Sequence, residues 1–108
     1  MGKYKGKRAK ATDIPQSVKE AVWERDNHRC VLCGSEKANP WCHLIARSQG
    51  GLGIEQNVIS MCDNCHRRYD NTTDRKSIKA FLIEYIKGFY PDWNEQDVVY
   101  DKWSMLKQ

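Results

Sequence analysis

The chain has 108 residues, of which 40% are hydrophobic and 30% charged, a balance typical of one soluble globular domain. No apolar run approaches the roughly 20 residues that span a bilayer, and residues 1–10 are too polar for a secretory signal. We therefore predict a cytoplasmic protein with no membrane partner, whose five cysteines are kept reduced and are not joined in disulfides.

The N-terminal segment is basic: residues 1–11 contain lysine and arginine but no acidic side chain. We interpret residues 1–11 as a flexible arm that DNA phosphates would order, and residues 12–108 as a single domain. A helix is predicted to begin close to Asp13, which can cap its free amide groups, and Pro15, which suits a first turn. That helix should end by residues 26–27.

The middle of the chain alternates tight turns with short apolar runs, which predicts a hairpin and a following helix. The predicted elements are a knuckle at 30–34, a strand at 41–45, a glycine-rich loop at 46–56, a strand at 57–61, a second knuckle at 62–65 and a helix at 63–70. This mixture of strands and helices predicts an α+β fold.

Residues 74–107 are predicted to form a helical extension. Its apolar side chains recur at helical spacing, at Ile78, Phe81, Leu82, Tyr85, Ile86 and Phe89. We expect this stripe to face the core, with Asp74 as its cap and Gly88 and Pro91 at its end. A last short helix from Asn94 should turn inward the side chains of Val99, Trp103 and Leu106.

Four of the five cysteines form two Cys-x2-Cys pairs, the spacing with which tight turns bind a tetrahedral zinc ion. The predicted ligands of this structural zinc are Cys30, Cys33, Cys62 and Cys65. Zinc would supply much of the folding free energy of so small a domain, on the order of 10 kcal/mol. The 28 residues between the pairs exceed the usual gap of roughly 15–20, which indicates a functional insert.

The insert and its flanks carry a set of motifs with fixed spacing. These are Arg25-Asp26, Cys30-x2-Cys33-Gly34, His43-Leu44-Ile45, Gly50-Gly51, Asn57-Val58-Ile59 and Cys62-x2-Cys65-His66. On these residues, segment 23–70 resembles the HNH endonuclease family, and the tail resembles extensions of small phage nucleases. The resemblance implies a small zinc-bound ββα-metal finger with flanking N- and C-terminal helices.

Hydrolysis of a phosphodiester needs a base that activates water and a cation that neutralises charge on the phosphate. His43 on the first strand is the candidate base, and His66 on the following helix is the candidate ligand of a divalent cation (Mg²⁺, Mn²⁺, Ni²⁺ or Zn²⁺). Asp70 shares the helix face of His66 and is a second candidate ligand, or else it pairs with an arginine. Asn57 resembles the central family asparagine, which either bonds the backbone across the glycine loop and holds His43 or ligates the metal.

Position 42 departs from the family pattern, in which Asp or His commonly precedes the base and helps to bind the metal. Either Cys42 ligates a softer divalent ion, or His66 and Asp70 hold the metal with water, or catalysis is weak. The arginines that flank the proposed centre, each also consistent with an ordinary surface residue, are Arg47, Arg67 and Arg68.

These features predict a metal-dependent DNA endonuclease that nicks DNA or cuts both strands, with His43, Asn57 and His66 as its catalytic residues. Its sequence preference should be weak and its affinity strongly dependent on salt. One alternative is a non-catalytic zinc-stabilised module that binds DNA or a protein. Another is an accessory subunit of a phage DNA-packaging machine; a homodimer or phage packaging proteins are further possible partners.

Overall fold

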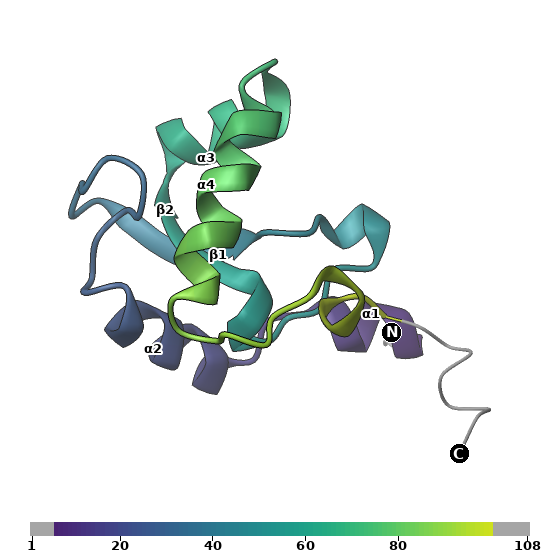
Figure 1. Cartoon of the computed structure of the whole chain (residues 1–108). Helices are drawn as coiled ribbons and strands as arrows, with labels where there is room; N and C mark the ends of the chain where they lie inside the picture. Colours follow the sequence, from purple (N-terminus) through teal and green to yellow (C-terminus); the bar gives the residue numbers. More distant parts are fainter. Residues whose placement is uncertain (1–5, 101–108) are drawn as a thin grey trace, which may run out of the picture.

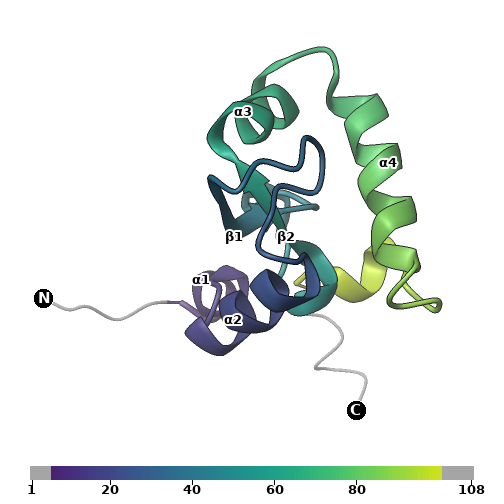
Figure 2. The same ribbon diagram turned by 90° about the vertical axis from the view of Figure 1, so that its left-hand side faces the viewer.

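The computed structural model describes residues 6–100, which fold around one antiparallel hairpin. Its strands are β1 (Ala38–His43) and β2 (Val58–Cys62), and its helices are α1 (Lys7–Thr12), α2 (Gln16–Arg25), α3 (Asp63–Asn71) and α4 (Arg75–Lys87). Short 3-10 turns are η1 (Arg47–Gln49), η2 (Glu55–Asn57) and η3 (Glu95–Val98). In Figure 1 and Figure 2 the hairpin lies between α3 on one side and α1 with α2 on the other. The predicted α+β class is confirmed, and no helix in residues 6–100 could span a membrane.

The two strands pair with one extra residue on β1. Asn39 is opposite Met61, whereas Cys42 is opposite Ile59, so the register shifts between the two pairs. Pro40 lies in this interval and has no N–H to donate to the ladder, which is the usual setting for a bulge.

The first strand begins earlier than the apolar pattern predicts. It was expected at 41–45, but it runs from Ala38 to His43, and the two apolar residues after it continue as loop. Because side chains alternate along a strand, Trp41 and His43 share the solvent-facing side and Cys42 is fully buried on the other. The other expected elements lie within a few residues of their predicted bounds.

The apolar side of α4 covers the hairpin with Ile78, Leu82 and Ile86. Two members of the predicted stripe do not join the core, since Phe81 is 50% exposed and Phe89 is 47% exposed. Phe81 lies on the flank of the helix, and Phe89 follows the helix end at Lys87, so neither side chain continues the buried row.

The C-terminal prediction also needs a correction. Val98 at the end of η3 is fully buried, and Val99, which was expected to face inward, is half-buried against the core and forms an isolated bridge with Gly51. The side chain of Asn94 caps this turn by accepting a hydrogen bond from the backbone N–H of Asp97. The expectations for residues 103 and 106 lie outside the described residues.

Part of the expected flexible arm belongs to the fold. The helix α1 occupies residues 7–12, and the guanidinium of Arg8 donates a hydrogen bond of 2.9 Å to the carbonyl of Ser48. The backbone N–H of Gly53 donates to the carbonyl of Ala11 at 3.0 Å. These contacts attach α1 to the loop between the strands, while residues 1–5 lie outside the described part of the chain.

The helix after α1 begins without the predicted side-chain cap. Pro15 occupies the cap position of α2, and the carboxylate of Asp13 accepts a hydrogen bond of 2.7 Å from Arg47. The carboxylate of Asp26 at the other end of α2 accepts from the backbone N–H of Ser60 and the hydroxyl of Tyr85. Buried and fully hydrogen-bonded, Asp26 joins α2, β2 and α4 at one point.

Candidate active site and metal cluster

The four cysteines predicted as zinc ligands lie together in the structure. The sulfur atoms of Cys30, Cys33, Cys62 and Cys65 all lie within 4.8 Å of one another. Two of them, Cys33 Sγ and Cys62 Sγ, are 3.6 Å apart, and no cysteine is in a disulfide. Tetrahedral zinc with bonds of about 2.3 Å would separate its sulfur ligands by about 3.8 Å, so this set fits a metal ion.

Each knuckle also directs backbone N–H groups at its sulfurs. The N–H of Cys33 lies 3.5 Å from Cys30 Sγ, and the N–H of Cys65 lies 3.5 Å from Cys62 Sγ. Burial raises the pKa of Cys30, but backbone hydrogen bonds to its sulfur outweigh this effect and lower the pKa to about 7. Burial raises the pKa of Cys65, so a cation is needed to hold all four groups as thiolates. We refer to this site as the four-cysteine cluster.

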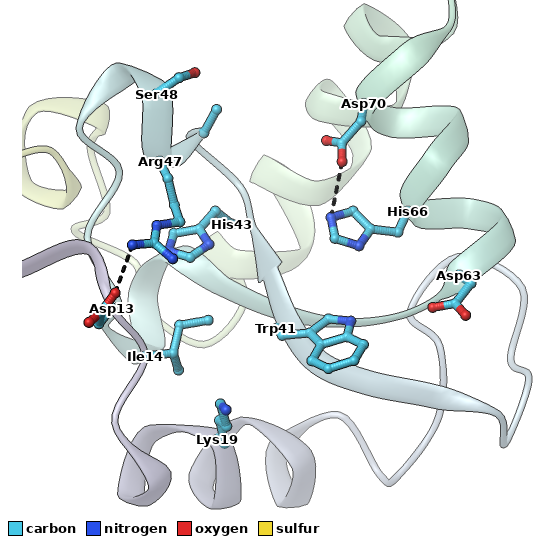
Figure 3. Close-up of a pocket in the computed structure, with 11 residues that line it drawn as sticks. Asp13, Ile14, Lys19, Trp41, His43, Arg47, Ser48, Asp63, His66 and Asp70 are labelled. Carbon is cyan, nitrogen blue, oxygen red and sulfur yellow. Dashed lines mark hydrogen bonds and ion pairs between the residues drawn. The ribbon is translucent and has the colours of Figure 1, made fainter. Parts of the chain in front are cut away.

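A second site is the cleft of about 760 Å³ that His43 and His66 line together (Figure 3). His43 extends from the end of β1, and His66 extends from the first turn of α3. The other lining residues are Asp13, Ile14, Lys19, Trp41, Ala46, Arg47, Ser48, Asp63 and Asp70. We call this space the His43 cleft.

A backbone carbonyl sets the orientation of His43. Its Nε2 lies 2.8 Å from the carbonyl oxygen of Thr12, at the end of α1. Because a carbonyl only accepts hydrogen bonds, Nε2 carries the proton and Nδ1 keeps a free lone pair. Burial lowers the pKa of His43, and the nearby charge of Arg47 acts in the same sense, whereas the hydrogen bond to the Thr12 carbonyl acts in the opposite sense. The ring is therefore neutral at neutral pH and able to accept a proton at Nδ1.

The imidazole of His66 pairs with a carboxylate on its own helix. His66 Nε2 lies 3.2 Å from Asp70 Oδ2, one turn further along α3. Arg75 at the start of α4 approaches the second oxygen, Oδ1, at 3.8 Å. An imidazole nitrogen and a carboxylate oxygen at this separation are suitable as two ligands of one divalent cation. Within residues 6–100, only the four-cysteine cluster gathers three or more such ligand atoms.

Asn57 holds the loop between the strands and is fully buried. Its Oδ1 accepts from the N–H of Ile45 at 2.8 Å, and its Nδ2 donates to the carbonyls of Ile45 and Leu52 at 3.2 and 2.9 Å. A Cβ on Gly51 would lie 1.7 Å from the Ile45 carbonyl oxygen, so only glycine allows this close approach. Of the two predicted roles for Asn57, the geometry favours the backbone clamp, since every polar atom of its side chain is used.

Three predicted site residues lie away from the cleft. The thiol of Cys42 is buried in the core on the opposite side of β1, and burial raises its pKa to about 12. Cys42 does not line the His43 cleft, so the structure does not bring it together with His66 and Asp70. Arg67 and Arg68 are exposed on α3 and do not line the cleft, and Arg68 pairs with Asp74. Of the three predicted arginines, only Arg47 lines it.

Sequence reasoning missed the contribution of the N-terminal segment to this cleft. The carbonyl of Thr12 orients His43, Asp13 pairs with Arg47, and Lys19 lines the cleft from α2. Trp41 was treated only as part of a strand. Trp41 lies two residues before His43, and alternate residues of a strand share a face. This spacing could have predicted that Trp41 lies beside His43.

One comparison with known proteins gives a relative. Anaredoxin from a Nostoc species is 32% identical to this chain over 56 residues, which cover 50% of this chain and 72% of Anaredoxin. No family model matches the chain, and no solved structure matches it.

Proposed function

We propose that this chain, which belongs to the same family as Anaredoxin, is a metal-dependent endonuclease that hydrolyses phosphodiester bonds in DNA. The observation that carries the proposal is the neutral imidazole of His43, whose free Nδ1 shares a cleft with the His66–Asp70 pair. In this proposal the fold is the ββα-metal finger of the HNH nucleases, and the protein acts on DNA in the cytoplasm.

The reaction begins with a water molecule between His43 and the scissile phosphate. Nδ1 of His43 takes a proton from this water as its oxygen attacks phosphorus. The carbonyl of Thr12 keeps the imidazole in the required tautomer and orientation throughout this step. The leaving oxygen departs on the opposite side of the phosphorus atom and takes up a proton from solvent water in the open cleft.

The leaving side of the phosphate faces α3. His66 Nε2 and Asp70 Oδ2 would hold a divalent cation at this point, and such a cation supplies Lewis-acid stabilisation of negative charge. Arg75 keeps the Asp70 carboxylate beside His66, and Arg47 provides a guanidinium for the phosphate oxygens. The four-cysteine cluster then has a structural role, because it fixes the start of α3 against β2.

A second candidate function follows from the donor set of the cluster and the name of the relative. Four thiolates in a tetrahedral arrangement suit iron as well as zinc, and Cys33 is exposed to solvent. Iron there would make the chain a one-electron carrier. Metal analysis of the purified protein and the visible absorption of an iron-loaded sample distinguish the two, since zinc is colourless.

The nuclease proposal is tested by cleavage of supercoiled plasmid in Mg²⁺, Mn²⁺, Ni²⁺ or Zn²⁺. We expect His43→Ala to slow cleavage by about 100- to 10,000-fold, the usual contribution of a general base. His28→Ala is the matched control, because His28 is exposed and pairs only with Glu24 and the ring of Trp23. Equal rates for wild type and His43→Ala in every metal would overturn the catalytic role of His43.

Metal stoichiometry separates the enzyme from a non-catalytic zinc module. Native mass spectrometry should find two ions per chain after equilibration with Mn²⁺, and His66→Ala should lose one of them. A single zinc ion that is unaffected by His66→Ala would favour the binding module or an accessory subunit of a larger machine.

A further inference from the structure

The indole of Trp41 is 46% exposed, although it is one of the largest apolar side chains in the described residues. It lies on the lining of the His43 cleft beside His66, with Lys19 of α2 across from it (Figure 3). The other exposed large apolar side chains in this part of the chain, Phe81 and Phe89, lie outside the cleft. Trp41 therefore offers an aromatic surface at the place where substrate would enter.

Trp41 also borders a second hollow, of about 350 Å³, between α2 and the start of β1. Its polar lining residues are Gln16, Lys19, Glu20 and Asn39, and Trp23 is a further aromatic wall. The side-chain amide of Gln16 donates a hydrogen bond of 3.3 Å to the carboxylate of Glu20. The hollow adjoins the His43 cleft, since Trp41 and Lys19 line both spaces. An aromatic face beside polar side chains is suited to a flat, polar-edged ligand such as a nucleobase.

The cation of Lys19 completes this surface. Lys19 makes no ion pair with any residue in the described range 6–100, whereas Arg47 in the same cleft pairs with Asp13. Its ammonium group is therefore available for a phosphate oxygen of the nucleotide whose base lies on Trp41. Aromatic side chains next to such cations are the usual elements of single-strand binding sites.

We infer that Trp41 and Lys19 form a platform that binds an unpaired nucleotide next to the scissile phosphate. The inference rests on the proposed nuclease function and specifies its substrate class as DNA with a single-stranded or frayed segment at the cut. In an intact duplex both faces of each base are covered by neighbouring bases, so Trp41 could stack only on a base that has left the helix. We call these two residues the Trp41 platform.

The test measures binding apart from cleavage. The 108-residue His43→Ala chain, with its four-cysteine cluster loaded with zinc and no other divalent cation, is titrated into fluorescein-labelled oligothymidylate or a blunt duplex. We expect the added change Trp41→Ala to weaken single-strand binding by about 5- to 150-fold, the range for loss of one base stack. Duplex binding should change less than about twofold, and Trp41→Phe should retain most of the single-strand affinity.

Matched controls keep the result specific. Phe81→Ala removes an aromatic side chain of similar exposure outside the cleft and should leave both affinities unchanged. Lys19→Gln should lower the slope of log affinity against log salt by about 0.7, which corresponds to one lost phosphate contact on a single strand. Thermal unfolding of each variant identifies any that fail to fold. If Trp41→Ala fails to fold, Trp41→Leu takes its place, because leucine keeps an apolar side chain but has no aromatic face, and the same loss of single-strand affinity is expected.

The outcomes distinguish the two proposals. Equal losses on single-stranded and duplex DNA, or no loss for Trp41→Ala, would overturn the platform. If Trp41→Ala loses single-strand binding while the wild-type chain cleaves no DNA in any metal, the nuclease proposal fails and the nucleotide-binding surface stands.

Discussion

The four-cysteine cluster and the His43 cleft are built from the same hairpin and the same helix α3, but they depend on different ranges of the chain. Within each pair of the cluster, a thiol lies three residues from its neighbour, and a tight turn sets that geometry locally. The cleft depends on contacts that span the domain, such as the bond between His43 and Thr12, 31 residues apart.

This difference separates what stabilises the domain from what the domain could do chemically. The cluster is a closed set of four soft donors, which suits a structural ion. The cleft is open, with a neutral imidazole at one side and an imidazole–carboxylate pair at the other. Disrupting the cluster should therefore abolish folding, whereas changes at the contacts of the cleft should alter rates in a folded protein.

The largest effect is expected from loss of one cluster ligand. Cys62→Ser should remove most of the metal-dependent folding free energy, which is on the order of 10 kcal/mol, and leave the domain unfolded by circular dichroism. Cys42→Ala is the matched control, because Cys42 lies outside the cluster, and it should stay folded with its metal bound. A Cys62→Ser protein that is folded without metal would show that the apolar core alone stabilises the domain, which would contradict this prediction.

A smaller effect, on the rate of cleavage, is expected from a substitution at Gly53, where the loop between the strands contacts the N-terminal segment. A Cβ on Gly53 would lie 1.9 Å from the carbonyl oxygen of Asp13, so Gly53→Ala must displace the chain that carries the Thr12 carbonyl. Misplacing the base by about 1 Å should slow plasmid cleavage roughly 100-fold, while zinc content is unchanged. Gly6→Ala, with open space around its Cβ, should cleave like wild type; equal rates for both variants would contradict this positioning role.

The smallest effect concerns pH. In the proposed reaction His43 acts as a base only when neutral, and its lowered pKa means that the neutral form persists below the ordinary value of about 6.5. Single-turnover cleavage should therefore rise with pH and reach half its maximum below pH 6.5. Arg47→Ala removes a positive charge that lowers this pKa, so its midpoint should move to higher pH. An unchanged midpoint would mean that another group titrates.

The elements of the fold were largely predictable because their signals are local. Two Cys-x2-Cys pairs predicted the four-cysteine cluster, and the stripe through Ile78, Leu82 and Ile86 predicted the buried side of α4. The start of β1 was misplaced because its first residues, including Pro40, carry no apolar alternation, although they pair across the sheet. The helix α1 was not predicted, because residues 7–12 show no apolar periodicity and fell almost entirely within the segment expected to be flexible.

The site was predictable in part, from the family resemblance around His43 and His66. Three features required the folded structure: the carbonyl of Thr12, the burial of Cys42 and the exposure of Trp41. The burial of Cys42 and the exposure of Trp41 depend on which side of β1 faces solvent, and the contact of Thr12 depends on where α1 packs against the hairpin. Residue type and spacing do not determine these contacts, because they form between segments far apart in the chain.

The central claim is that the free Nδ1 of neutral His43 removes the proton from the attacking water. Chemical rescue tests it most directly: supercoiled plasmid is incubated with His43→Gly in Mn²⁺, with increasing imidazole in the buffer. We predict that His43→Gly is inactive alone and that cleavage returns in proportion to the unprotonated imidazole. Cleavage by His43→Gly at the wild-type rate without imidazole would contradict the claim.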